Sequence, residues 1–166
     1  MLSVKRITRS LIDNQQKIRL VVFISYCFFI IYYTLLCRKV GENHRADLRF
    51  MWAYREMIIG HPEWKEDVGY NLKNILFFAP FGFWFPSFGT LRLLQIFRGR
   101  SWLLILLAGM IFSFFIEITQ YIICCGLCEL DDVLCNGFGS LIGFWLYLAV
   151  RKELVRYQSR GDRFRE

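Results

Sequence analysis

Four runs of apolar residues divide the chain, and polar and charged residues gather between them. The first run, residues 20–37, contains no charged residue and lies between Arg19 and Arg38. The later runs cover about residues 72–91, 102–123 and 133–150. Each run is close to the roughly 20 residues that a helix needs to cross the apolar core of a bilayer. The pattern predicts an all-α integral membrane protein built on a bundle of four transmembrane helices.

Composition supports a membrane protein over the other classes. Hydrophobic residues make up 55% of the 166 residues, and 17 of them are Phe. A small soluble domain buries only about two-thirds of its surface and could not hide this much apolar area. Disordered chains are excluded because they are poor in aromatic residues. The domain organisation expected is a basic arm (1–19), a membrane domain (20–150) with a long loop (38–71), and a basic tail (151–166).

The basic residues flank the apolar runs and predict the orientation of the chain. The net charge is +7, and 14 Lys and Arg residues lie in the N-terminal arm, the connection after the second run and the C-terminal tail. The other side of the predicted bundle has seven. Because cytoplasmic loops carry an excess of Lys and Arg, we expect a multi-pass protein of the cell membrane with both termini in the cytoplasm. Charges placed this way do not form the basic face of a nucleic-acid-binding protein.

The long loop contains a short segment with helical periodicity. Its apolar positions recur every three or four residues, and Gly60-His61-Pro62 provides a stop signal. We expect an amphipathic helix on the outer face, either on the membrane surface or packed over the mouth of the bundle. The residues on its expected contact face are Leu48, Met51, Trp52, Arg55, Ile58 and Ile59.

Polar side chains interrupt the apolar runs at helical spacing. Glu117 and Gln120, three residues apart in the third run, share one helix face, as do Asn71 and Asn74 at the start of the second. An acidic residue within a span usually faces the bundle interior or water. The predicted topology places these residues and the start of the fourth run at similar depth on the extracytoplasmic side. A polar pocket or a purely structural hydrogen-bond network fits this pattern, and the candidate ligand-binding residues are Asn71, Asn74, Glu117, Gln120, Asp131, Asp132 and Asn136.

Proline and glycine residues in the spans predict how the helices pack. Pro80 lacks a backbone donor and invites a kink in the second helix. Gly82 lies two residues later, and Gly139 and Gly143 continue the stripe that begins at Asp132 in the fourth run. Small residues at such spacing allow neighbouring helices to approach closely. We assign structural roles to these four residues.

The same positions resemble the motifs of the VanZ-like family. One segment contains Asn71, Asn74 and Pro80-Phe81-Gly82-Phe83, and another contains Glu117-x-x-Gln120 followed by Asp131, Asp132 and Asn136. The resemblance covers roughly residues 47–150. The family is named for resistance to the glycopeptide teicoplanin, so the resemblance implies a protein of the cell envelope. The chain departs from the pattern at Gly126, where many members carry Arg.

Two classes of function fit these residues. In the first, the protein is not an enzyme, and its outer pocket binds a lipid headgroup, a lipid-linked cell-wall precursor or a glycopeptide. In the second, Glu117 with Asp131 or Asp132 acts as an acid/base pair on a lipid-linked substrate, because such chemistry needs two carboxyl groups with separated pKa values. Membrane lipids are the expected partners of either, and a homo-oligomer is a further expectation. No cofactor is expected.

The cysteines offer a third reading. Cys124, Cys125 and Cys128 lie in the turn between the third and fourth runs, where they fit free thiols, a structural disulfide, or a redox pair made of Cys125 and Cys128. His44 and His61 in the long loop lack the ligand spacing of a metal site. We therefore expect no bound metal.

Overall fold

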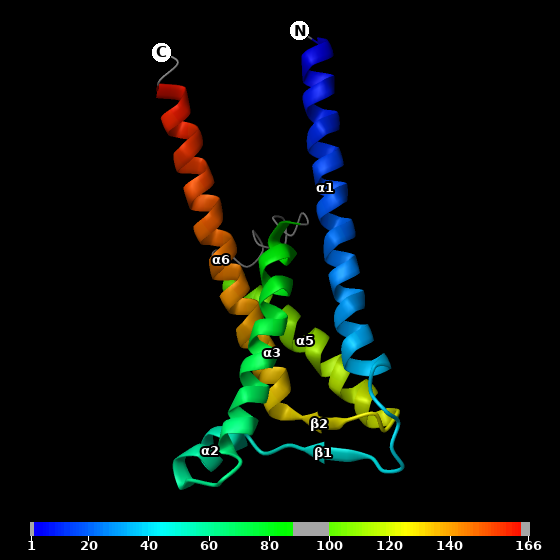
Figure 1. Ribbon diagram of the computed structural model, residues 1–166. Coiled ribbons are helices and arrows are strands. Elements are labelled where there is room, and N and C mark those ends of the chain that lie inside the picture. Colours follow the sequence, from blue (N-terminus) through cyan, green and yellow to red (C-terminus); the bar gives the residue numbers. More distant parts are fainter. Residues whose placement is uncertain (1, 88–99, 164–166) are drawn as a thin grey trace.

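The computed structural model describes residues 2–87 and 100–163, and it is mostly helical. The main helices run through the molecule, and a short helix and two short strands lie at one end of it (Figure 1). The elements are α1 (Leu2–Ile31) with a π-helical turn η1 (Tyr32–Leu36), β1 (Arg45–Asp47), α2 (Trp52–Ile59), α3 (Trp64–Trp84) with a 3-10 turn η2 (Phe85–Ser87), α5 (Ser101–Ile122), β2 (Leu127–Glu129) and α6 (Leu130–Arg163).

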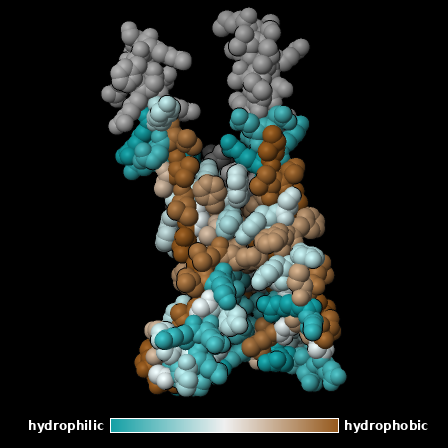
Figure 2. All heavy atoms as spheres, in the orientation of Figure 1, coloured by the Kyte–Doolittle hydropathy of each residue, from teal (hydrophilic) through white to brown (hydrophobic). Residues whose placement is uncertain are grey.

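Both chain termini lie at the same end of the molecule (Figure 1). The strands β1 and β2 and helix α2 lie at the opposite end, which we call the strand end. Hydrophobic residues gather on the helices between the two ends, and hydrophilic residues are more frequent at the strand end and toward the termini (Figure 2). An apolar band between two polar ends is the surface that a membrane protein presents to a bilayer.

Three of the described helices are long and apolar enough to cross a membrane: Asn14–Leu36, Ser101–Ile122 and Leu130–Tyr157. The predicted fourth span is not confirmed. We expected it at residues 72–91, whereas α3 begins earlier, at Trp64, and its first half carries charged and amide side chains that lower its hydropathy. Residues 88–91, at the end of the expected span, lie outside the described residues, as do Arg92 and Arg98 of the connection that follows.

Helices α3 and α6 make the closest contact in the fold, because glycine residues face a neighbouring backbone. A Cβ atom at Gly82 would collide with the backbone of Ser140, and one at Gly139 would collide with the carbonyl of Ile75. Gly143 lies equally close to the carbonyl of Ala79. The α-helical backbone of α3 continues through Pro80. Direct backbone contact therefore fixes these two helices relative to each other.

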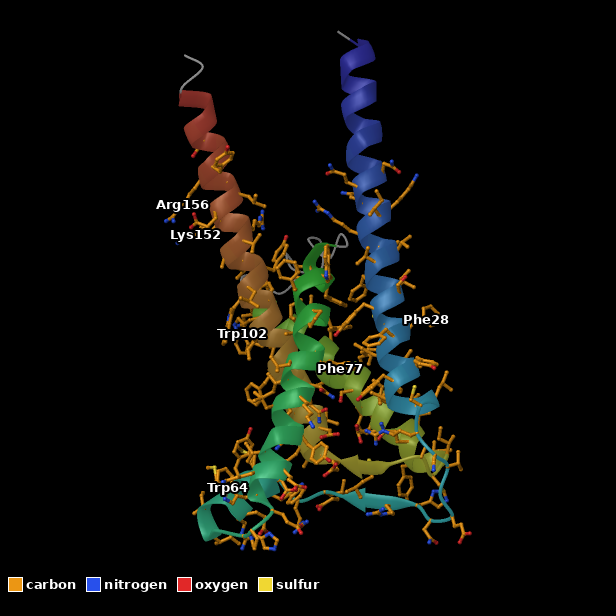
Figure 3. All side chains as sticks on the ribbon, viewed as in Figure 1. Phe28, Trp64, Phe77, Trp102, Lys152 and Arg156 are labelled. Carbon is orange, nitrogen blue, oxygen red and sulfur yellow. The ribbon has the colours of Figure 1, made fainter. Side chains whose placement is uncertain are left out.

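Helix α1 packs on the bundle through aromatic rings. Phe77 of α3 lies 5.6 Å from Phe29 and 5.4 Å from Tyr33 between ring centroids. The Tyr26 hydroxyl donates a hydrogen bond to the Phe77 carbonyl at 2.5 Å, close to the carbonyl that Pro80 leaves without a backbone donor. Phe28 lies on the outer side of α1 and is 67% exposed (Figure 3). Side-chain contacts thus hold α1, with no glycine-lined groove.

The strand end differs from the loop that the sequence suggested. Strands β1 and β2 pair in parallel, with Arg45 opposite Leu127 and Asp47 opposite Glu129. The short helix α2 begins at Trp52 instead of Leu48, because Met51 has the left-handed backbone conformation (φ 49°). Its membrane-surface role is not confirmed; it contacts α3, and Ile58 is 80% exposed. Two loops far apart in sequence are therefore joined at this end.

Candidate functional site

The predicted polar residues lie toward the strand end, on α3, α5 and the start of α6. Five of them are buried, with less than a tenth of the residue exposed: Asn71, Glu117, Gln120, Asp131 and Asn136. Asn74 and Asp132 are half-buried. Burial of this many amide and carboxylate groups is costly unless hydrogen bonds satisfy them, so the partners of each group define the site.

Asn74 and Asp132 form the part of the cluster that is open to the surroundings. The Asn74 amide donates a hydrogen bond to the Asp132 carboxylate, which joins α3 to α6. Both residues line a cleft of about 650 Å³. The rest of its lining is mostly aromatic or charged, with one threonine and one leucine: Tyr26, Phe29, Tyr33, Thr34, Arg38, Tyr70, Lys73, Leu76, Phe77 and Glu129. The cleft therefore combines charged groups with an apolar wall from α1 and α3.

Glu117 lies behind this cleft and is held by the turn that precedes α6. Its carboxylate accepts a hydrogen bond from the backbone N–H of Glu129 at 3.0 Å. The carboxylates of Glu117 and Asp132 repel one another, and the positive charge of Arg38 attracts both. Arg38 is thus the cation that offsets the negative charge of the cluster.

Gln120 connects α5 to the end of α1. Its amide donates a hydrogen bond to the Thr34 carbonyl at 3.1 Å, within η1. Its Oε1 atom is directed at Gly126, where an added Cβ atom would lie 2.9 Å from it. The Arg38 guanidinium reaches the same place, with Nη1 2.6 Å from that Cβ position. Gly126 therefore leaves space for two side chains from different elements.

The remaining three residues are buried away from the cleft. Asn136 donates a hydrogen bond to the Ser113 hydroxyl at 2.7 Å. The carboxylate of Asp131 accepts one from the backbone N–H of Met51 at 2.6 Å, so it anchors the start of α2 instead of facing Glu117. Asn71 is buried on α3. The structure thus divides the predicted set into a cleft pair and a buried layer behind it.

Four buried polar atoms in this region have no hydrogen-bond partner among the described residues: Asn71 Nδ2, Gln120 Oε1, Asp131 Oδ2 and Asn136 Oδ1. All four belong to the predicted polar set. A buried donor or acceptor left unpaired costs about 1–3 kcal/mol, and native proteins have few of them. Their concentration in one layer is the pattern expected where water or a ligand completes the hydrogen bonding.

Glu129 and Asp47 are neighbours across the two strands with opposite electrostatic behaviour. Burial, with the nearby charges of Asp132 and Asp47, raises the pKa of Glu129 to about 7. The hydrogen bond from Arg49 lowers the pKa of Asp47. Glu129 therefore changes its charge near neutral pH and Asp47 does not.

The cysteines form no disulfide: all six are free thiols. Of the alternatives for Cys124, Cys125 and Cys128, the structure has the free thiols: Cys124 has a left-handed backbone conformation and its sulfur lies 3.2 Å from His44 Nδ1, and Cys125 is buried. The described residues also contain no group of three or more His, Cys, Asp or Glu side chains arranged to hold a metal ion.

Of the twelve residues that line the cleft, only Asn74 and Asp132 belonged to the candidate set predicted from the sequence. Arg38, Thr34 and Lys73 were read only as flanking charges or as part of a span. Arg38 and Lys73 each lie next to an apolar run that contributes aromatic residues to the cleft, and this was the signal available. The sequence does not show that basic and aromatic side chains from two separate helical segments line one cleft; the fold is needed for that.

The fold and this cluster define a helical membrane protein with a polar site at the end opposite its termini. The model of the VanZ/LLP1 family matches residues 20–151, and the chain belongs to this family. The matched region contains α3, α5, both strands and every predicted polar residue. Comparisons with curated proteins and with solved structures gave no match.

Proposed function

We propose that this protein binds the headgroup of a membrane lipid or lipid-linked cell-wall precursor in the cleft between α1 and α3. The observation that carries the proposal is the composition of the cleft: the hydrogen-bonded pair Asn74 and Asp132 shares one cavity with Tyr33 and Phe77. A headgroup needs polar partners, and the chain attached to it needs an apolar wall. The cleft supplies both at one end of the apolar band.

The proposal includes an orientation and a cellular role. With the termini in the cytoplasm, the strand end faces the extracytoplasmic side, where cell-wall precursors and glycopeptides are found. A contribution to glycopeptide resistance, including teicoplanin, would follow from binding such a precursor. A reporter fused after Glu166 should behave as cytoplasmic and one inserted near Glu63 as external; the reverse labelling would place the cleft on the other side.

Binding is tested with the full chain purified in dodecyl maltoside. We expect added dioleoyl phosphatidylglycerol to raise the midpoint of thermal unfolding of the wild type, because a ligand that binds only the folded state stabilises it. Asn74→Leu should fold and lose this shift, since it removes the amide that positions Asp132. Arg156→Gln is the matched control, because Arg156 is exposed on α6 toward the C-terminus and pairs only with Glu153 among the described residues (Figure 3).

Absence of a lipid-dependent shift in the wild type, tested also with phosphatidylethanolamine and a lipid-linked pyrophosphate, would overturn the proposal. An equal shift in wild type and Asn74→Leu would place the binding elsewhere on the protein. The same variants, expressed in cells, should differ from the wild type in glycopeptide sensitivity if the cellular role is correct.

A further inference from the structure

Arg38 is a charged group at the cleft whose guanidinium is available for a ligand. It follows η1 directly, lines the cleft and is exposed. Its guanidinium makes no hydrogen bond or ion pair of 4.0 Å or less with any described residue. By contrast, Arg49 at the same end pairs with Asp47. An unpaired guanidinium beside buried carboxylates keeps its five donors available for a ligand.

Gly126 sets the position of this guanidinium. Because Gly126 has no side chain, Arg38 Nη1 occupies the space that a Cβ atom would need, 2.6 Å from the Cβ position. Gln120 Oε1, a buried acceptor that has no hydrogen-bond partner within residues 2–87 and 100–163, converges on the same point at 2.9 Å. The tip of the exposed Arg38 side chain therefore reaches the edge of the buried layer, and the residue lines the cleft.

A second cation completes the basic side of the cleft. Lys73 of α3 is exposed, lines the same cavity, and its ammonium lies 4.6 Å from the centroid of the Tyr70 ring. This cation–π contact restricts the conformations of the Lys73 ammonium group, which keeps its positive charge. Lys73 thus lies on α3, and Arg38 lies just after the η1 turn that ends the first helical segment.

We propose that the ligand of the cleft is a phosphate ester whose phosphate is bound by the Arg38 guanidinium, with Lys73 as the second cation. Guanidinium groups bind phosphate oxygens through paired hydrogen bonds, and these charge-assisted bonds are stronger than neutral ones. The aromatic wall from Phe29, Tyr33 and Phe77 fits the acyl chain of a phospholipid. This assignment rests on the proposed function and names the chemical class of its ligand.

The competing role for Arg38 is structural. Its charge offsets those of Glu117 and Asp132, and removing it would destabilise the cluster whether or not a ligand binds. Stability alone does not separate the two roles. Ligand affinity separates the two roles if a second variant places a guanidinium in the same space from a different position in the chain.

The test measures binding of dioleoyl phosphatidylglycerol to the full chain in dodecyl maltoside, with dioleoylglycerol, which lacks the phosphate, as the matched lipid. We expect the wild type to prefer the phosphate-bearing lipid and Arg38→Gln to bind it about tenfold more weakly or worse. The double variant Arg38→Gln/Gly126→Arg should regain most of the affinity, because a side chain at residue 126 enters the space that the Arg38 guanidinium leaves. Arg38→Gln/Gly126→Leu fills the space without charge and should stay weak.

Unchanged affinity in Arg38→Gln, or a folded Gly126→Arg double variant as weak as Arg38→Gln alone, would overturn the assignment and leave lipid binding intact. If the double variant does not fold, methylguanidinium added to Arg38→Ala supplies the same group, and failure to restore binding is equally decisive. A soluble arm identifies the source: if sn-glycerol 1-phosphate binds the wild type as tightly as the lipid, Arg38 remains the phosphate residue and the ligand is a soluble ester.

Discussion

Helices α1 and α6 both extend between the strand end and the end that holds the termini (Figure 1). In the most apolar stretch of α6, 50% of the residues are buried, against only 6% in that of α1. The difference follows from how each helix meets α3. Glycine residues bring the α6 and α3 backbones into contact, whereas rings of α1 and α3 stand between the α1 and α3 backbones. Close backbone contact leaves no space for a ligand, and ring contact leaves a cleft beside it. The better-packed pair is the frame, and the looser pair carries the candidate site.

The frame is tested most severely at Gly143. Gly143→Leu places a side chain where the Ala79 carbonyl already lies, and a backbone atom cannot move aside as a flexible side chain does. We expect a loss of more than about 3 kcal/mol in the free energy of unfolding, or no folded protein. Gly69→Ala is the matched control in α3: a Cβ there meets nothing within 4 Å, so helix propensity should raise stability by up to about 1 kcal/mol. Unfolding in detergent measures both, and equal stability of the two variants would remove the distinction between frame and cleft.

The ring contact of α1 should be weaker. Phe77→Ala removes the ring that touches Phe29 and Tyr33, and because Phe77 is half-buried we expect a cost of about 2 kcal/mol. Phe28→Ala changes a ring directed away from the bundle and should cost less than about 0.5 kcal/mol in detergent (Figure 3). The same unfolding measurement applies. A larger loss for Phe28→Ala would mean that α1 docks through its other face.

The pH dependence of stability should trace to Glu129, which lines the cleft. Its pKa is raised from 4.5 to about 7, so the folded state holds the proton more tightly than the unfolded state. This stabilisation is complete below pH 4.5 and is lost as the pH rises through 7. Glu129→Gln should remove this decline and stabilise the protein at pH 8 by about 1 kcal/mol, since solvent screens a half-exposed group.

Asp47→Asn supplies the contrast for that measurement. Arg49 lowers the pKa of Asp47, so its contribution is present at neutral pH and is lost only when the pH falls through that lowered pKa. Asp47→Asn should therefore keep the decline between pH 5 and 8, but move it to somewhat lower pH, because the Asp47 charge helps to raise the pKa of Glu129. A profile that is the same in wild type and Glu129→Gln would assign the titration to another group.

The smallest effect on stability is expected for Glu117→Gln and Asp132→Asn. Each amide keeps an oxygen that accepts the existing hydrogen bond, from Glu129 or from Asn74, and relieves buried charge. We expect both variants to insert, fold and unfold within about 0.5 kcal/mol of the wild type, but to lose any envelope phenotype. Normal phenotype in both would mean that the cluster serves only to pack the helices.

The sequence allowed much of the buried layer to be anticipated, because its residues recur at helical spacing in strongly apolar runs. The positions of Gly139 and Gly143 followed from the same periodicity. The α3 span did not, since the polar first half of that helix dilutes its hydropathy. Strands β1 and β2 are three residues each and show no alternation, so nothing local predicts their pairing. Arg38 was counted only as a flanking charge. Its approach to Gly126 depends on the strand end, where β1 pairs with β2.

The parallel pairing of β1 and β2 also sets an order of assembly. Arg45 emerges early during synthesis, but its partner Leu127 appears only after α2, α3 and α5 have been made. Such non-local contacts form late, because the intervening chain must first be ordered. Asp47, Glu129 and the start of α6 therefore come together at the end of folding. A nascent chain that stops before residue 127 lacks Glu129 and Asp132 of the cleft lining, so the candidate site is complete only when the whole fold is.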